Sequence, residues 1–312
     1  MTGELAYIDR LRAIATDPAA RGLDDDAALL DGLVLTHDMI AEGVHFLPAD
    51  PPASVGWKLV AVNVSDLAAK SAEPLAALMG ASLSGDDGWD AAFLSGVAEA
   101  CAAFGLALIG GDTIALPPGA PKVFGLTAIG RAGPATPARS GGKPGDSLWL
   151  AGSLGDATAG LAQLRADPTA DGPLVEAYRR PQPLLAAGRA MAADASAMMD
   201  VSDGLLIDLA RLCTASGCGA RVDLDALPLS PAFVAAHGSD RAARLMAATG
   251  GDDYALLAAF PPAMDPAVRI HLPSAVILTC IGSLAGGSGP LIFDQAGEAP
   301  LPERLGYEHH RL

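Results

Sequence analysis

The hydrophobic pattern of the first half of the chain changes repeatedly between helical and strand-like spacing. Apolar residues recur at helical spacing within residues 4–14, which predicts a short N-terminal helix. Strand-like apolar runs follow at 33–38, 75–83, 106–111 and 122–130. Two longer helical stretches lie between them, at about 54–70 and 88–104. Because helices separate the strands, we expect a mixed sheet that carries helices on one face.

Gly, Pro and Ser become frequent between residues 131 and 146, and such a stretch interrupts regular structure. We therefore place a domain boundary there. The second half opens with a strand-like segment at 147–150 and then alternates between helical and strand-like patterns. The predicted helices cover about 155–165, 183–193, 203–216 and 241–248, and the predicted strands cover 219–224, 254–260 and 275–283.

Composition and charge narrow the class of protein. A chain of 312 residues is long enough for about two domains. Acidic residues outnumber basic ones by 36 to 20 without a basic stripe, so we expect no nucleic-acid partner. The chain start lacks a signal-peptide pattern and no run of about 18 apolar residues occurs, which predicts a cytoplasmic protein with no membrane partner. The 4 cysteines lack zinc-ligand spacing and are expected to be reduced packing residues.

Aspartates in short motifs are the candidate chemistry of the chain. They are Asp26, Asp38, Asp66, Asp112, Asp200, Asp203 and Asp252. Asp38 and Asp112 follow strand-like runs, and Asp66 lies in an otherwise apolar helix, where a buried carboxylate needs compensation. Carboxylates at the ends of apolar strands come together once a sheet forms, and Mg²⁺ relieves their repulsion most simply. The pattern predicts several Mg²⁺ ions and a polyphosphate ligand.

Neither a Walker nor a Rossmann glycine motif occurs in the sequence. We therefore expect the phosphate oxygens to be bound by the Mg²⁺ ions that the aspartates hold. Gly110 and Gly111 would let backbone amides approach an anion. Ser202 and Asp203 are predicted to cap the helix that follows them, and a helix N-terminus is itself an anion site.

Each motif also has a simpler interpretation when it is taken alone. The run 24–26 is then a solvated turn, Asp203 a helix cap, the glycines before Asp112 a loop, and His45 a structural histidine. The motifs indicate a function only in combination.

The order of the motifs resembles that of the thiamine-monophosphate kinases over nearly the whole chain. The motifs are Gly22-Leu23-Asp24-Asp25-Asp26, Thr36-His37-Asp38, Glu42-Gly43-Val44-His45-Phe46, Asn63-Val64-Ser65-Asp66-Leu67-Ala68-Ala69, Gly110-Gly111-Asp112-Thr113, Arg139-Ser140-Gly141-Gly142-Lys143-Pro144-Gly145-Asp146, Asp200-Val201-Ser202-Asp203-Gly204-Leu205 and Gly250-Gly251-Asp252-Asp253-Tyr254. Single motifs recur in aminoimidazole ribonucleotide synthetase, selenophosphate synthetase and a hydrogenase maturation factor, which share the fold. The segments 42–46 and 63–69 favour the kinase.

The resemblance implies a fold and a reaction. The fold would be the two-domain α+β fold of aminoimidazole ribonucleotide synthetase. Its N-terminal domain, at 1–135, would carry a mixed sheet and helices, bind metal and ATP, and form a homodimer. Its C-terminal α/β domain, at 146–312, would complete the active-site cleft. The reaction would be ATP- and Mg²⁺-dependent phosphorylation of thiamine monophosphate to thiamine diphosphate, by direct in-line transfer.

The resemblance also implies a role for individual residues. The metal ligands would be Asp26, Thr36, Asp38, Asp66, Asp112, Asp200 and Asp203, with His37 contributing through its backbone carbonyl. The ATP contacts would be Gly111, Asp112, Arg139 and Ser202, and the residues around thiamine monophosphate would be His45, Asp252 and Tyr307. The catalytic residues would be Asp112, Arg139 and Asp203.

Some positions depart from the family pattern. Asp24 replaces a usual glycine, His37 a small hydroxyl residue, Lys70-Ser71 a Met-Gly pair, and Asp252 and Ala255 two glutamates. The ring of His37 is a poor ligand for a hard cation. We expect the changes at His37 and Asp252 to slow turnover or alter substrate preference, and we expect the Lys70-Ser71 region to serve packing.

Two rival functions remain at this stage. One is an ATP-dependent enzyme of the same fold with a different acceptor. A selenophosphate synthetase would have an N-terminal cysteine loop, whereas the first cysteine here is Cys101. The other is a degenerate protein that binds ATP and Mg²⁺ without turnover, and the retention of all the acidic positions argues against it.

Overall fold

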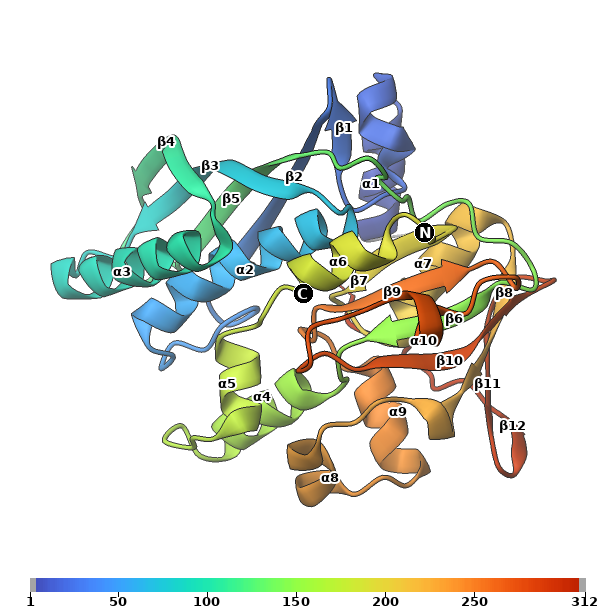
Figure 1. Ribbon diagram of the computed structural model, residues 1–312. Coiled ribbons are helices and arrows are strands. Elements are labelled where there is room, and N and C mark those ends of the chain that lie inside the picture. The colour runs from blue at the N-terminus through green and yellow to red at the C-terminus, as the bar shows by residue number, and fades with distance from the viewer. Residues whose placement is uncertain (1–3, 309–312) are drawn as a thin grey trace.

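The computed structural model describes residues 4–308 and contains two β-sheets, each covered by helices (Figure 1). Helix α1 (Glu4–Arg12) and a 3-10 helix (Pro18–Leu23) precede the first strand. Within the described range, no helix is long and apolar enough to cross a membrane. The arrangement confirms the expected α+β class with two mixed sheets.

Five strands form the N-terminal sheet. They are β1 (Ala28–Leu30), β2 (Leu33–Ala41), β3 (Glu73–Leu83), β4 (Ala107–Ala115) and β5 (Val123–Arg131). Their order is β1-β2-β5-β3-β4, and β3 and β4 are parallel while the other neighbours are antiparallel. Side chains alternate between the two faces of a strand, so Thr36 and Asp38 share one face of β2 while His37 lies on the other.

Helices α2 (Pro52–Ala69) and α3 (Asp87–Phe104) cover one face of this sheet, as the sequence predicted. Helix α2 is buried on all sides from Val55 to Ala69, because it lies between the N-terminal sheet, α3 and elements of the second domain. A helix that is apolar all round is a core helix. The carboxylate of Asp66 is thereby carried into the interior.

The opposite face of the N-terminal sheet exposes large apolar side chains on β2, β3 and β4. They are Met39, Leu78 and Ile114, which are between 43% and 55% exposed. An exposed apolar area of this kind marks an interaction surface.

Seven strands form the C-terminal sheet. They are β6 (Ser147–Ala151), β7 (Ala197–Val201), β8 (Gly219–Asp223), β9 (Ala255–Phe260), β10 (Leu278–Ala285), β11 (Gly289–Asp294) and β12 (Gly297–Ala299). Their order is β12-β11-β8-β10-β6-β9-β7, and only the described pair β8 and β11 is parallel.

Helices accompany both faces of the second sheet. They are α4 (Asp156–Ala166), α5 (Pro173–Arg179), α6 (Leu185–Met191), α7 (Leu205–Ser216), α8 (Pro231–His237), α9 (Arg241–Thr249) and α10 (Pro266–Arg269), with a 3-10 turn at Leu224–Ala226. The hydrophobic pattern predicted α4, α6, α7 and α9 and the strands β6, β8, β9 and β10. It missed β1, β7, β11, β12, α5, α8 and α10.

The two domains share a core at the C-terminal end of α2. Ala68 and Ala69 belong to one apolar cluster with Met191 and Phe260 of the second domain. A Cβ atom on Gly188 of α6 would lie 2.0 Å from the carbonyl oxygen of Ala68, so glycine permits this close approach of the helices. The packing fixes the C-terminal domain against the helix that carries Asp66.

Candidate active site between the two domains

Helix α2 connects the polar groups of the two domains through its buried side chains. The Oγ of Ser65 donates a hydrogen bond to Asp200 at 2.6 Å, and Asn63 Oδ1 accepts one from the backbone amide of Asp38 at 2.8 Å. The hydroxyl of Thr36 donates a short hydrogen bond to Asp66. These contacts hold β2 and β7 against α2 in a fixed orientation.

Three carboxylates from distant segments converge beside α2. Asp26 comes from the bend before β1, Asp66 from α2 and Asp200 from the end of β7. Each offers one oxygen, and these oxygens lie within 4.8 Å of one another. Oxygen donors of this kind are the ligands that Mg²⁺ prefers. The structure therefore brings together three of the residues that the sequence predicted as metal ligands.

The electrostatics of the cluster are unfavourable without a cation. Burial raises the pKa of Asp66 well above its ordinary range, and the charges of Asp38 and Asp200 add to the shift. Burial, followed by the charge of Asp26, raises the pKa of Asp200 to about 8. Burial and the neighbouring Asp203 raise the pKa of Asp38 to about 6. A bound divalent cation would reverse these shifts by stabilising the ionised forms.

Asp26 differs from its neighbours because two cations contact it. Burial favours its protonated form, but the charges of Lys70 and Arg139 outweigh burial and lower its pKa. Nε and Nη2 of Arg139 both lie 2.5 Å from Asp26 Oδ1, and Nζ of Lys70 lies 2.6 Å from Oδ2. The guanidinium expected to contact ATP is thus placed at the carboxylate cluster.

The segment 202–204 is shaped by a carboxylate farther along α7. Oδ2 of the buried Asp208 accepts hydrogen bonds from the backbone amides of Ser202, Asp203 and Gly204 at 3.0, 3.0 and 3.2 Å. The predicted capping by Ser202 and Asp203 is therefore wrong, because Gly204 is the N-cap residue and Asp208 accepts the hydrogen bonds of these three amides. Asp203 lines a cavity of the protein. Its carboxylate also forms an ion pair with Arg211 at 2.6 Å.

A cavity of about 660 Å³ adjoins the carboxylates. Its lining includes Asp38, Ser202 and Asp203 together with all three residues expected around the substrate, which are His45, Asp252 and Tyr307. The backbone amide of Tyr307 donates a hydrogen bond to the carbonyl oxygen of Asp203 at 2.9 Å. This bond holds the segment around Tyr307 against the cavity. The cavity volume lies within the range of small-molecule sites.

A buried lysine connects Asp252 and His45 in the lining of this cavity. Nζ of Lys58 lies 2.8 Å from Asp252 Oδ2 and 2.9 Å from the carbonyl oxygen of His45. The hydroxyl of Tyr254 donates to Asp252 Oδ1 at 3.0 Å. Asp252 and Tyr254 have φ values of 68° and 52°, in a region that costs non-glycine residues energy and that recurs at functional sites.

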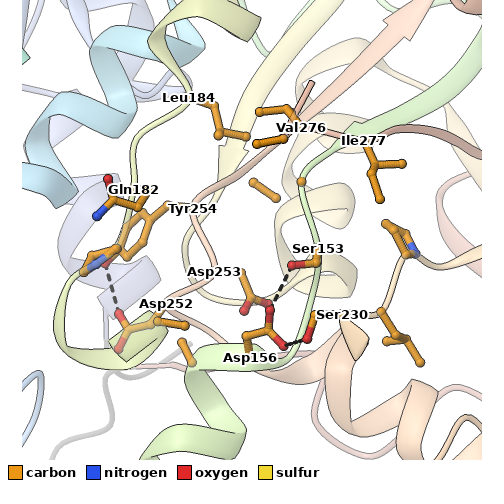
Figure 2. A pocket seen from close by; sticks show the side chains of 18 of the residues that line it. Ser153, Asp156, Gln182, Leu184, Ser230, Asp252, Asp253, Tyr254, Val276 and Ile277 are labelled. Carbon is orange, nitrogen blue, oxygen red and sulfur yellow. Dashed lines mark hydrogen bonds between the residues drawn. The ribbon is translucent and has the colours of Figure 1, made fainter. Parts of the chain in front are cut away.

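A second cavity, of about 370 Å³, is drawn in Figure 2. Asp252 and Tyr254 line both cavities. Figure 2 shows Asp156 held by Ser153 and Ser230, whose hydroxyls lie 2.9 and 2.5 Å from its carboxylate oxygens.

Two predicted ligands lie away from the cluster within the single chain. The ring of His37 faces the open side of the N-terminal sheet, where Nδ1 lies 2.9 Å from Thr127 Oγ1. The register places Asp112 opposite Gly80 on the edge strand β4, with β3 and β5 between it and β2. Only the backbone carbonyl of His37 and not its ring is compatible with the metal role.

Several site residues escaped the sequence analysis. Lys70 had been assigned to packing, and that interpretation is wrong, because its ammonium group contacts Asp26. Lys58 and Asp208 are polar residues within apolar helices, which is the signal that singled out Asp66. The partners of Lys58 lie far away in sequence and those of Asp208 are set by the fold of the turn before α7, so the sequence did not predict what either residue contacts.

Comparison with known proteins places this site in a family. The model of the AIR synthase related protein N-terminal domain matches residues 24–132, and that of the C-terminal domain matches residues 143–265. The fold and the site thus define an AIR synthase-related protein. Hydrogenase maturation protein HypE in complex with ATP shares the fold with a TM-score of 0.70 and 20% identity, over 93% of this chain and 91% of that chain.

More similar relatives are thiamine-monophosphate kinases. That of Caulobacter vibrioides is 39% identical, over 98% of this chain and 90% of the relative, and that of Salmonella typhimurium is 37% identical, over 97% and 95%. The structure described as AaThiL complexed with AMPPCP and TMP has a TM-score of 0.85 and 28% identity, over 99% of this chain and 97% of that chain. The structure from Stenotrophomonas maltophilia has a TM-score of 0.76 and 35% identity, over 94% and 96%. The chain belongs to the thiamine-monophosphate kinase family, as its motifs predicted.

Proposed function

We propose that the protein transfers the γ-phosphoryl group of ATP to thiamine monophosphate, which yields thiamine diphosphate and ADP. The observation that carries the proposal is the 660 Å³ cavity, because it joins the expected substrate residues to Asp38 and Asp203. The relative solved with AMPPCP and TMP shares the fold over 99% of this chain. An acceptor and a nucleotide can therefore meet at the carboxylate cluster.

Mg²⁺ is the cation that the site fits. The ligands would be Thr36, Asp26, Asp38, Asp66, Asp200 and Asp203. The fit rests on the convergence of three carboxylates within 4.8 Å and on the raised pKa values of Asp66 and Asp200, which a cation would lower. When bound, Mg²⁺ would neutralise and align phosphate oxygens.

The protein residues would position the phosphates rather than remove a proton. A phosphate monoester has a second pKa of about 6 and is already largely ionised near neutral pH, so no general base is needed. The guanidinium of Arg139 is 20% exposed and can clamp phosphate oxygens. We propose direct in-line transfer; isolation of a kinetically competent phosphoprotein would contradict it.

We also propose a homodimer formed by the open faces of two N-terminal sheets. Three large apolar side chains are exposed there, and cross-strand pairing places Asp112 in the same row as Met39. The predicted roles of Gly111 and Asp112 in ATP and metal binding would then involve the site of a partner chain. A Met39→Asp variant should be a monomer in light scattering coupled to size-exclusion chromatography, and a wild-type monomer would contradict the proposal.

The remaining expectations about organisation stay predictions. The two sheets extend over residues 28–131 and 147–299, which supports the bounds 1–135 and 146–312 for the domains. A cytoplasmic location and the absence of nucleic-acid and membrane partners are proposed from the sequence alone.

The test of the function is product detection by chromatography. The protein is incubated with ATP, Mg²⁺ and either thiamine monophosphate or thiamine. Thiamine diphosphate should form only from the monophosphate and should disappear with EDTA. Asp66→Asn should abolish product, whereas the exposed Asp171→Asn should not. ATP binding without product from wild type would favour the degenerate binder, and turnover of another acceptor would favour the rival enzyme.

A further inference from the structure

Lys70 places a positive charge inside the carboxylate cluster. It is the C-cap residue of α2, and its side chain is 0% exposed. A buried ammonium group is costly unless charged or polar partners compensate for it. The residue therefore needs partners, and the structure supplies them from three separate segments of the chain.

Four oxygen atoms surround the Lys70 ammonium group. Nζ lies 2.5 Å from Asp25 Oδ1, 2.6 Å from Asp26 Oδ2, 3.0 Å from Met198 O and 3.2 Å from Pro137 O. Two carboxylate and two carbonyl oxygens form a ligand set of the kind that binds a hard cation. The side chain of Lys70 occupies the centre of this set.

We infer that the Lys70 ammonium group is a built-in cation that takes the place of one metal ion at Asp25 and Asp26. This inference rests on the proposed metal dependence of the site. The protein then binds one cation fewer on this side of Asp26 than it would with a neutral residue at position 70. Asp66 and Asp200 hold the exchangeable metal, to which Asp26 contributes through Oδ1 and not through Oδ2.

Charge repulsion explains why the Lys70 ammonium group and a metal ion on Asp26 Oδ2 exclude each other. A metal ion on Asp26 Oδ2 would lie next to Nζ, and two positive charges a few ångström apart in a buried site repel strongly. Nζ cannot easily withdraw, because the carbonyl oxygens of Pro137 and Met198 hold it from the other side. Arg139 already contacts Oδ1, so both oxygens of Asp26 have a positively charged partner.

The experiment counts bound metal ions in full-length protein without nucleotide. Mn²⁺ replaces Mg²⁺, and free Mn²⁺ is measured by electron paramagnetic resonance during titration. Lys70→Met, which keeps a long side chain but removes its charge, should bind one Mn²⁺ more per chain than wild type. The matched control is Lys122→Met, which changes the net charge equally but lies away from the cluster, in an ion pair with Glu42. It should bind the wild-type number.

A second readout covers the case in which the metal-free variant is unstable. The melting temperature of Lys70→Met should be lower than that of wild type in EDTA, and Mg²⁺ should raise it by more than it raises wild type. Lys70→Gln, a neutral polar replacement, should follow the same pattern if the methionine variant does not fold. Equal Mn²⁺ numbers in wild type and in the folded variant would overturn the inference and leave the kinase proposal intact. If Lys70→Met binds one Mn²⁺ more than wild type but wild type makes no thiamine diphosphate, the result supports the inference about Lys70 and contradicts the kinase proposal.

Discussion

Removal of divalent cations should make the protein less stable as the pH rises. Burial, with repulsion between neighbouring carboxylates, raises the pKa of Asp38 to about 6, that of Asp200 to about 8 and that of Asp66 well above the ordinary range. In the unfolded chain an aspartate titrates near pH ~3.9. From about pH 4 to about pH 8, the metal-free folded state therefore holds protons that the unfolded state has lost.

The sign of the effect follows from these directions. Stability from a group with a raised folded pKa is fully present below the unfolded pKa and is lost as the pH rises through the folded value. Each retained proton lowers the free energy of unfolding by about 1.4 kcal/mol per pH unit. Because the carboxylates share protons, we expect the folded state to hold one to two protons more than the unfolded state between pH ~5 and ~7, which lowers the free energy of unfolding by about 3–6 kcal/mol over this range. Asp26, whose pKa is lowered, acts in the opposite direction, and its effect lies below the unfolded value.

Urea unfolding followed by circular dichroism measures this directly. Samples in EDTA and in Mg²⁺ are compared from pH 5 to pH 8. Mg²⁺ binds the ionised carboxylates, so its stabilising effect should grow with pH. Asp200→Asn should flatten the pH dependence in EDTA, and the exposed Asp171→Asn should leave it unchanged. Stability in EDTA that stays constant or rises across this window would refute the reasoning.

Three further outcomes follow from single contacts. Asp208→Asn keeps an acceptor but removes the charge facing three backbone amides, so the free energy of unfolding should fall by about 3 kcal/mol and the KM for ATP should rise; an unchanged KM would argue against its positioning role. Gly188→Ala drives a Cβ atom into the Ala68 carbonyl oxygen and should cost about 1–3 kcal/mol in thermal or urea unfolding. His37→Thr should leave turnover unchanged, because the ring points away from the carboxylate cluster. Asp252→Glu should change the KM for thiamine monophosphate, because Asp252 lies in the cavity lining beside Lys58. Steady-state kinetics in which His37→Thr alters turnover and Asp252→Glu leaves the KM unchanged would contradict both roles.

The candidate site could be predicted in part because its residues break local rules. Asp66 stands in a run of apolar residues, and a carboxylate in that setting needs a partner wherever the helix packs. Asp38 lies on β2 of the N-terminal sheet and Asp200 on β7 of the C-terminal sheet, and both strands pack against α2. The motifs identified these residues and the long elements that carry them, although they assigned Lys70 to packing.

Tertiary contacts decided which residues of the site meet and where the short strands form. Asp26 meets Arg139 across 113 residues of sequence, and Ser65 meets Asp200 across 135. Local propensity holds no information about such pairs, because they depend on how two sheets pack around α2. The short strands β7 and β11 likewise form through their neighbours in the sheet.

The sequence by itself determined which carboxylates, glycines and long helices the protein has, because those features depend on residue type and local spacing. The tertiary structure alone decided which of them meet. It turned the ring of His37 outward, placed Asp112 on an open sheet face and inserted the ammonium group of Lys70 between Asp25 and Asp26. The physical reason is that the face of a strand and the partner of a buried charge are fixed by packing between segments that are distant along the chain.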